Sequence, residues 1–466
     1  MLIVQARYLK FEDITFLQPF CISLQFTQKT KLYNHWLALA GNTAAQMSDS
    51  EAKTVTAKIY ESATTNVPPK MQRVRDAAFK ALGTLEPAGP PKSDTEARGL
   101  MLSSRTNGGQ TLPAYYLVYF LLVDLLGFPK LGKWEKVAWS VPVRYHGRLY
   151  EIAHRKFGLG IFAPNLDPNA RMSAPPSEQD EADAREIAKL INKAVSVAEP
   201  YFKWRAEQAA AGNQLNVLNN NYWLFERYEF FRNRFKALSE EAEARKNERN
   251  VEKKTSEDGT EATTVSFPSD SLRKEAEWYA QAAIEAFFSW TEHAFIHLAI
   301  LQGRLHSGED VAKLAGADWK TKFKFALDLG DAQTKKHYNS LLDLRAQIRN
   351  YMAHGAFGKR GEAFFFHSGA GAVPVLLTGH QKHRYSLWGK PVFDERWAIK
   401  EIEQFITHLW SGPRLPARIY IFSSLPNILT FVADGSYTRA MQSEDDMKQF
   451  VDYLTYHFDS AANMDW

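Results

Sequence analysis

The chain has 466 residues, a formal net charge of +4 and 45% hydrophobic residues. At roughly 150 residues per domain, this length suggests two to four domains, and the composition is ordinary for a globular protein. The small positive charge permits a nucleic-acid partner without requiring one. The single cysteine, Cys21, excludes an intramolecular disulfide and fits a reducing cytoplasm.

The sequence gives no sign of a membrane or secretory segment. Residues 1–7 have no basic region ahead of their apolar residues, as a signal peptide would. The most apolar run, residues 114–127, is shorter than the roughly 20 residues that span a bilayer, and Asp124 interrupts it. We therefore expect this run to be a buried helix in a cytoplasmic protein with no membrane partner.

The first half of the chain mixes helical and strand-like patterns. Two short runs with Gly147 between them predict a β-hairpin within residues 135–162. The other expected elements are strands in 1–28, helices in 29–82, a loop at 84–98 and a proline-containing linker at 163–178. No catalytic pattern is evident here, because His146 and His154 beside the hairpin are too weak a signal.

The second half is predominantly helical. A polar stretch at 248–270 is either a linker or a hairpin, and the sequence places the main domain boundary there. The elements expected around it are helices at 179–247, 271–304, 318–328, 334–354 and 395–409, a Gly-rich strand-like segment at 361–391, and a tail at 415–466 with a strand pair and a helix at 443–458.

The fold class expected from these elements is mainly α. The predicted divisions are a mixed α/β region at 1–177, a long helical segment at 178–250, a linker or hairpin at 251–270, a helical domain with a β-rich insertion at 271–412, and a strand–helix extension at 413–466.

The helix at 334–354 has a clear apolar face. On a helical wheel, Leu341, Leu344, Ile348, Tyr351 and Met352 fall on one side at i, i+3 and i+7 spacing. This stripe is expected to pack on the core, with the polar residues of the same helix on the opposite side.

Three polar residues share an arc at the end of this helix. Arg349 and His354 lie about 140° apart on the wheel, with Asn350 between them, and Gly355 suits the C-cap. Histidine titrates near neutral pH and can move protons, and the guanidinium fork suits phosphate oxygens. Such a set suits attack by an RNA 2′-hydroxyl on its own phosphodiester. The alternative is an ordinary capped helix with a surface arginine.

The run Arg349-Asn350-Tyr351-Met352-Ala353-His354 resembles the signature of the HEPN superfamily, which is Arg, four to six residues and His, often with Asn after the Arg. The resemblance covers roughly residues 271–412. It implies a helical bundle that dimerises and a metal-independent ribonuclease of the kind found in toxin–antitoxin, anti-phage and CRISPR systems. It assigns Arg349, Asn350 and His354 to catalysis, without metal or cofactor.

Family members often carry an acidic residue on an earlier helix, and Glu292 is the candidate; the alternative is an ordinary helix carboxylate. Two features depart from the family. The strand-like insertion is long, and Ala356 stands where members paired with nucleotidyltransferase antitoxins carry Tyr.

Basic residues cluster around the motif, where a phosphate backbone would bind them. We predict RNA contacts from Lys320, Lys322, Lys324, Lys335, Lys336, Lys359 and Arg360. The alternative is a set of ordinary solvated side chains.

Two other patterns are interpreted as structural. His293 and His297 are spaced i, i+4, as in some zinc sites, but no third ligand is evident, so core or surface roles are favoured. Residues 222–235 interleave aromatics with arginines. They could stack single-stranded bases, but a core or partner interface is favoured.

The expected function is an RNA endonuclease acting as a toxin or anti-phage effector. Its expected partners are RNA (tRNA is one candidate), a second copy of the chain, and an antitoxin or sensor protein. The alternative is a non-catalytic HEPN-like dimer that binds a nucleotide or a protein.

Overall fold

The computed structural model describes residues 67–89, 91–131, 133, 136–255, 261–354, 362–377, 385–387 and 394–464. The expected strands at 1–28, Cys21 and most of the expected helices at 29–82 lie outside these ranges. The protein is mostly helical, as predicted, with a small antiparallel sheet. It divides into two compact units, Met1–Ala209 with Tyr456–Trp466, and Ala210–Thr455.

The first unit is built on a five-stranded antiparallel sheet of order β1-β3-β4-β5-β2. The hairpin predicted at 135–162 is confirmed, and a third strand extends it. His146 and Gly147 both have positive φ at the β3–β4 turn, the conformation that matches the twist of a tight hairpin. The strands are β1 (Leu85–Pro87), β2 (Ser104–Arg105), β3 (Val137–Tyr145), β4 (Arg148–Arg155) and β5 (Gly158–Ala163).

Helices cover one face of this sheet. Val141 and Ile152 join the same buried apolar cluster as Ile187 and Ile191 of α6 (Glu178–Val197). The helix predicted at 114–127 is confirmed as α5 (Tyr115–Tyr119) continuing into the π-helix η4 (Phe120–Leu125), with four of its six residues buried. No helix among the described residues is long and apolar enough to cross a membrane.

Smaller helices complete the first unit: η2 (Pro69–Met71), α3 (Gln72–Ala81), α4 (Asp94–Met101) and η3 (Gly108–Thr111), with α7 (Glu199–Ala211) up to Ala209. On the opposite face of the sheet, Leu149 of β4 packs with Ala88 and with Leu100 of α4. The sheet is thus buried on both sides, and β3 is buried along almost its whole length.

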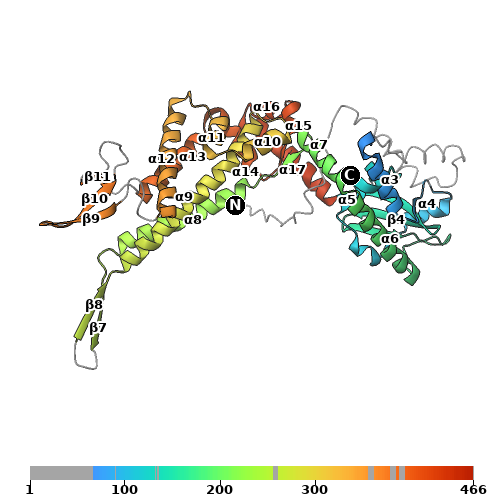
Figure 1. Cartoon of the computed structure of the whole chain (residues 1–466), viewed down its shortest axis with the longest axis horizontal. Helices are drawn as coiled ribbons and strands as arrows, with labels where there is room; N and C mark the ends of the chain where they lie inside the picture. Colours follow the sequence, from blue (N-terminus) through green and yellow to red (C-terminus); the bar gives the residue numbers. More distant parts are fainter. Residues whose placement is uncertain are drawn as a thin grey trace. The chain divides into compact units, whose positions relative to one another are not determined.

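The second unit is organised around two long antiparallel helices, α8 (Asn221–Ala244) and α9 (Pro268–Leu301), which lie side by side (Figure 1). Phe225 packs against Trp290 at 4.7 Å between ring centroids, and Tyr228 against Phe287 at 6.0 Å. The segment between the helices is a hairpin, β7 (Asn250–Thr255) and β8 (Glu261–Ser266).

The packing of α8 on α9 shows that the main domain boundary is not where the sequence predicted it. Residues 248–270, where the sequence suggests the main boundary, connect two helices of one unit. The compact units divide at Ala209 and Ala210 instead. The physical reason is that α8 and α9 bury their facing side chains against each other, so the chain cannot separate between them.

Helix α9 is the centre of a bundle. Its second half, from Ile284 on, is buried nearly all round, as expected for a helix that neighbours cover on several sides. The helices packed on it are α8, α10 (Gly308–Ala315), α11 (Trp319–Ala326), α13 (Glu395–Leu409) and α14 (Leu415–Phe422). Helix α12 (Ala332–His354) packs against α13.

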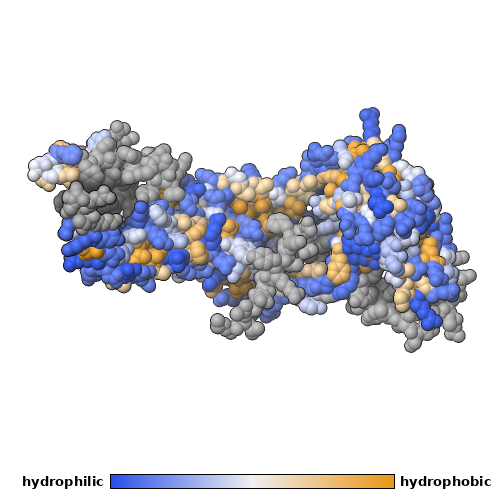
Figure 2. Space-filling model, turned by 90° about the horizontal axis from the view of Figure 1, so that it is seen from below, coloured by the Kyte–Doolittle hydropathy of each residue, from blue (hydrophilic) through white to orange (hydrophobic). Residues whose placement is uncertain are grey.

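The strand-like segment at 361–391 contains a three-stranded sheet of β9 (Glu362–Ser368), β10 (Gly371–Leu377) and β11 (Tyr385–Ser386). The tail differs from prediction. Instead of a strand pair, it has the two-residue strand β12 (Asn427–Ile428), which pairs with β6 (Asn216–Val217). Its other elements are η5 (Gly412–Arg414), α15 (Thr430–Ala433), α16 (Ser436–Ala440) and α17 (Glu444–Asn463), the last matching the predicted helix. Apolar residues form only small groups on the face in Figure 2.

Candidate functional site

Burial confirms the described part of the apolar stripe of α12, and the side chains of Tyr351 and Met352 are not part of what is described. Leu341, Leu344 and Ile348 have at most 1% of their surface exposed. The helical backbone continues to His354, so the motif occupies the last turns of α12. The side chains of Arg349, Asn350, Tyr351, Met352 and His354, and the whole of Gly355, lie outside the described residues.

Glu292 of α9 is paired with two cations. Its Oε2 lies 2.8 Å from Nζ of Lys322 on α11, and its Oε1 lies 3.2 Å from Nη2 of Arg345 on α12. The Lys322 side chain is only 6% exposed, whereas Glu292 and Arg345 keep about a third of their surface in water. The carboxylate therefore connects three helices of the bundle at a partly open position.

Arg345 also rests against aromatic rings. Its guanidinium carbon lies 5.6 Å from the ring centroid of Phe288 and 5.7 Å from that of Trp319. Trp319 is fully buried, and its Nε1 donates to the hydroxyl of Thr291 at 3.0 Å. Arg345 precedes Arg349 by one helical turn, so Glu292 approaches α12 one turn before the motif.

The predicted RNA-binding lysines differ in their exposure. Lys320, Lys324, Lys335 and Lys336 are exposed, as a phosphate-binding surface requires. Lys322 corrects that prediction, because its ammonium is buried in the pair with Glu292 and cannot reach a phosphate backbone. Lys359 and Arg360 lie outside the described residues.

His293 and His297 belong to a buried polar network. Their Nε2 atoms are 3.0 Å apart, the Asn220 backbone N–H donates to His293, and His297 contacts the amide of Asn427. Burial lowers the pKa of His293 to about 4 and that of His297 to about 3. His297 is fully buried, in line with the core interpretation. No group of three or more metal-binding side chains occurs among the described residues.

The aromatic stretch at 222–235 has two faces. Tyr228 and Phe235 are buried against the bundle, as the core interpretation expects, whereas Tyr222, Trp223 and Phe230 are about half exposed. The exposed rings belong to the same helix as the buried ones, so α8 serves both the core and the surface.

The first unit contains a buried carboxylate that the sequence did not indicate. Glu151 of β4 is 1% exposed. Its oxygens accept hydrogen bonds from the hydroxyls of Ser103 and Ser140 and from Nη2 of Arg155 at 2.6 Å. The signal available in the sequence was a single charge within the otherwise apolar run Leu149-Tyr150-Glu151-Ile152-Ala153 of the predicted hairpin.

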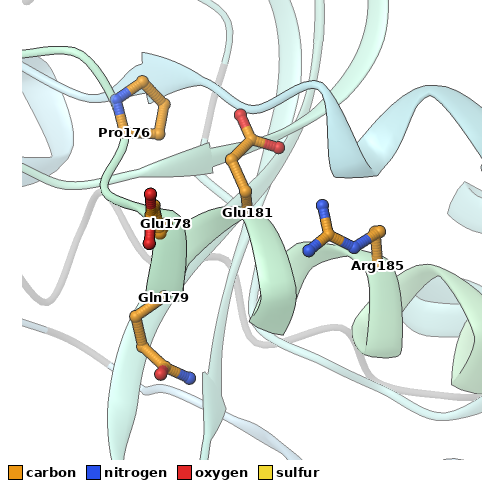
Figure 3. Close-up of a pocket in the computed structure, with 5 residues that line it drawn as sticks. All are labelled: Pro176, Glu178, Gln179, Glu181 and Arg185. Atoms are coloured by element: carbon orange, nitrogen blue, oxygen red, sulfur yellow. The ribbon is translucent and has the colours of Figure 1, made fainter.

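A shallow polar pocket lies at the start of α6 (Figure 3). It is lined by Pro176, Glu178, Gln179, Glu181 and Arg185. The Glu181 carboxylate accepts the backbone N–H groups of Asn107 and Gly108 at 2.8 and 2.7 Å. The pocket is therefore part of a helix–loop connection, and its two glutamates disfavour an anionic ligand.

Comparison with known proteins gives no match to a family model, a curated protein or a solved structure.

Proposed function

We propose that residues 271–412 form a HEPN-like helical domain with a metal-independent endoribonuclease site, acting as a toxin or anti-phage effector. The observation that carries the proposal is the approach of Glu292 to α12, one turn before the motif at the end of that helix. Glu292 thus contacts α12 one turn before the Arg-x4-His motif, as an acidic residue on an earlier helix is expected to do in this family.

The chemistry needs only side chains of the chain. His354 takes the proton of an RNA 2′-hydroxyl, the oxygen attacks the adjacent phosphorus, and the bond to the 5′-oxygen breaks. The leaving 5′-oxygen takes up a proton, and the products carry a 2′,3′-cyclic phosphate and a 5′-hydroxyl. Arg349 stabilises the charge that develops on the phosphorane, and Asn350 orients the phosphate or the imidazole.

Glu292 is a positioning residue in this scheme. Both of its oxygens are engaged by cations of the bundle, one of them buried, so its partners are other helices and not the substrate. Its pair with Arg345 instead fixes the rotation of α12 against α9 and α11. Misplacement of a reacting group by even 1 Å can lower the rate about 100-fold.

A two-fold dimer is part of the proposal. One helix end supplies a single arginine and a single histidine. Two copies facing each other across a two-fold axis supply two of each in one cleft. The exposed lysines Lys320, Lys324, Lys335 and Lys336 then contribute phosphate contacts beside that cleft.

The test is incubation of the purified protein with tRNA and with total RNA in the presence of EDTA. We expect cleavage that leaves 2′,3′-cyclic phosphate ends and that is lost in both Arg349→Ala and His354→Ala. Cleavage that persists in both variants contradicts the site assignment.

A second candidate is a non-catalytic dimer that binds a nucleotide or a protein. The observation that favours it is the same neutralised carboxylate, since Glu292 is already paired with Lys322 and Arg345. Tight binding of a nucleotide or protein partner, with no cleavage of any RNA offered, supports this candidate over the first.

A further inference from the structure

The turn between β4 and β5 in the first unit is held in place by an arginine from another strand. Arg105 of β2 donates from Nη1 to the carbonyl oxygen of Phe157 at 2.7 Å and from Nη2 to that of Leu159. Gly158 has a φ of 93°, which favours glycine. The chain therefore reverses here with a defined backbone.

Arg105 lies close against the surface of the sheet. A Cβ on Gly160 would come within 2.9 Å of Nε of Arg105 and within 3.2 Å of the Phe162 ring. The bare backbone of Gly160 thus makes room for the guanidinium beside that ring. Only a residue without a side chain allows this approach.

A second arginine packs on the Phe162 ring. The guanidinium carbon of Arg155 lies 3.7 Å from the Phe162 ring centroid, and its Nη2 donates to Ser103 and to Glu151. Arg105 is exposed and Arg155 keeps 25% of its side chain in water, whereas Glu151, the carboxylate paired with Arg155, is buried.

The tip of the turn adds an aromatic ring and another cation. Phe157 is 85% exposed, the highest exposure among the large apolar side chains of the described residues. Its neighbour Lys156 is exposed too, and the Lys156 backbone N–H donates to the carbonyl of Lys136 at 2.9 Å. Phe157 therefore offers an exposed aromatic face beside a cation, the combination on which a nucleic-acid base can stack.

We propose that Arg105, Arg155, Lys156 and Phe157, here called the basic turn, bind single-stranded RNA. The cations contact backbone phosphates, and the Phe157 ring stacks on one base. Such pairing of aromatic platforms with a positive surface is how proteins hold single strands without reading sequence. The choice of RNA as the ligand rests on the proposed function of the second unit; the choice of a polyanion with stacking bases rests on the turn itself.

An anionic membrane is the less favoured partner. One exposed ring inserts little apolar area into a bilayer, whereas one ring is sufficient to stack on one base. Arg105 is also fixed by hydrogen bonds to the turn and Arg155 by stacking on Phe162, which suits phosphates at defined positions along a strand.

The test measures binding of fluorescent oligouridylate to the full chain carrying His354→Ala, which prevents cleavage. In this background we expect Phe157→Ala to weaken binding about fivefold or more, the effect of one lost base stack. Lys156→Ala is expected to weaken binding and to lower the slope of log affinity against log salt by about 0.7, the effect of one lost phosphate contact. The matched controls are Phe79→Ala on α3 and Lys193→Ala on α6, both exposed in the same unit, and they should bind as the parent does.

Three outcomes overturn the inference. They are an absence of oligouridylate binding by the parent, equal affinities for Phe157→Ala and Phe79→Ala, and Phe157-dependent binding to phosphatidylserine vesicles but not to RNA. The failure of the proposed nuclease is distinguishable, because it appears as missing cleavage by the wild-type chain while oligouridylate binding still depends on Phe157.

Discussion

Oε1 of Glu292 on α9 lies 3.2 Å from Nη2 of Arg345 on α12, and the same carboxylate holds the nearly buried ammonium of Lys322. This pairing links the two helices that carry the candidate site. It gives Glu292 a structural role in addition to any effect on catalysis, and the two contributions can be separated by experiment.

Glu292→Gln should lower both stability and activity. The amide keeps the shape but removes the charge, so Lys322 is left buried without a counter-ion. We expect a loss of about 1–3 kcal/mol in the free energy of unfolding, measured by urea denaturation. Glu285→Gln, an exposed position on the same helix, is the control. Equal stability of the two variants contradicts a role for the pair.

The buried histidine pair should make the second unit sensitive to acid. The folded pKa of His293, about 4, lies below its ordinary value of 6.5, so the unfolded chain binds the proton more tightly. The stability that this group contributes is complete above pH 6.5 and is lost as the pH falls toward 4. His297, with a folded pKa of about 3, acts in the same direction, and its contribution continues to fall from pH 6.5 down to about pH 3.

His293→Gln therefore should reduce the loss of stability between pH 7 and pH 5, measured as the shift of the urea midpoint. The exposed His306→Gln is the control and should keep the wild-type pH dependence. If the pH dependence of stability is unchanged in His293→Gln, the buried histidine pair does not cause the loss of stability in acid.

In the first unit, Glu151→Ala should lower the free energy of unfolding by more than an ordinary surface substitution does. It leaves Arg155, Ser103 and Ser140 without their shared acceptor. We expect a loss of about 2–3 kcal/mol, less than for a fully buried pair because Arg155 keeps part of its surface in water. Hydrogen exchange of the β3 and β4 amides should localise the effect, and Glu86→Ala on β1 serves as control. Unaltered exchange in β4 would argue against the network.

The proposed site requires two copies of the chain. Light scattering should give a molar mass twice the 53.1 kDa of one chain. Specific activity should fall on dilution into the range where that mass decreases toward one chain. A monomer with full specific activity is incompatible with a site shared between two helix ends.

Local patterns predicted the elements more successfully than the contacts between them. The stripe of Leu341, Leu344 and Ile348 and the hairpin around Gly147 follow from periodicity and turn chemistry, and both are present. The domain boundary expected at 248–270 is absent. The sequence suggested it because a polar hairpin and a polar linker have similar compositions. Only the packing of α8 on α9 distinguishes them.

The burial of Lys322 follows in part from helical periodicity. It lies about 160° from both Lys320 and Lys324 on a helical wheel, so one face of the helix cannot expose all three. Its pairing with Glu292 could not be predicted, because it depends on how α9 and α11 pack. The hydrogen bonds of Glu151 could not be predicted for the same reason. Ser103 and Ser140 reach Glu151 only when three segments of the chain meet.

The most direct test of the proposed chemistry uses an oligonucleotide with a single ribonucleotide at the mapped cleavage position and deoxynucleotides elsewhere. The wild-type chain in EDTA should cleave it only at that position and leave a 2′,3′-cyclic phosphate. His354→Ala should be slower by about 100-fold or more, as expected for loss of a general acid–base group. Equal rates for His354→Ala and wild type, or cleavage of the all-deoxy strand, would contradict the account.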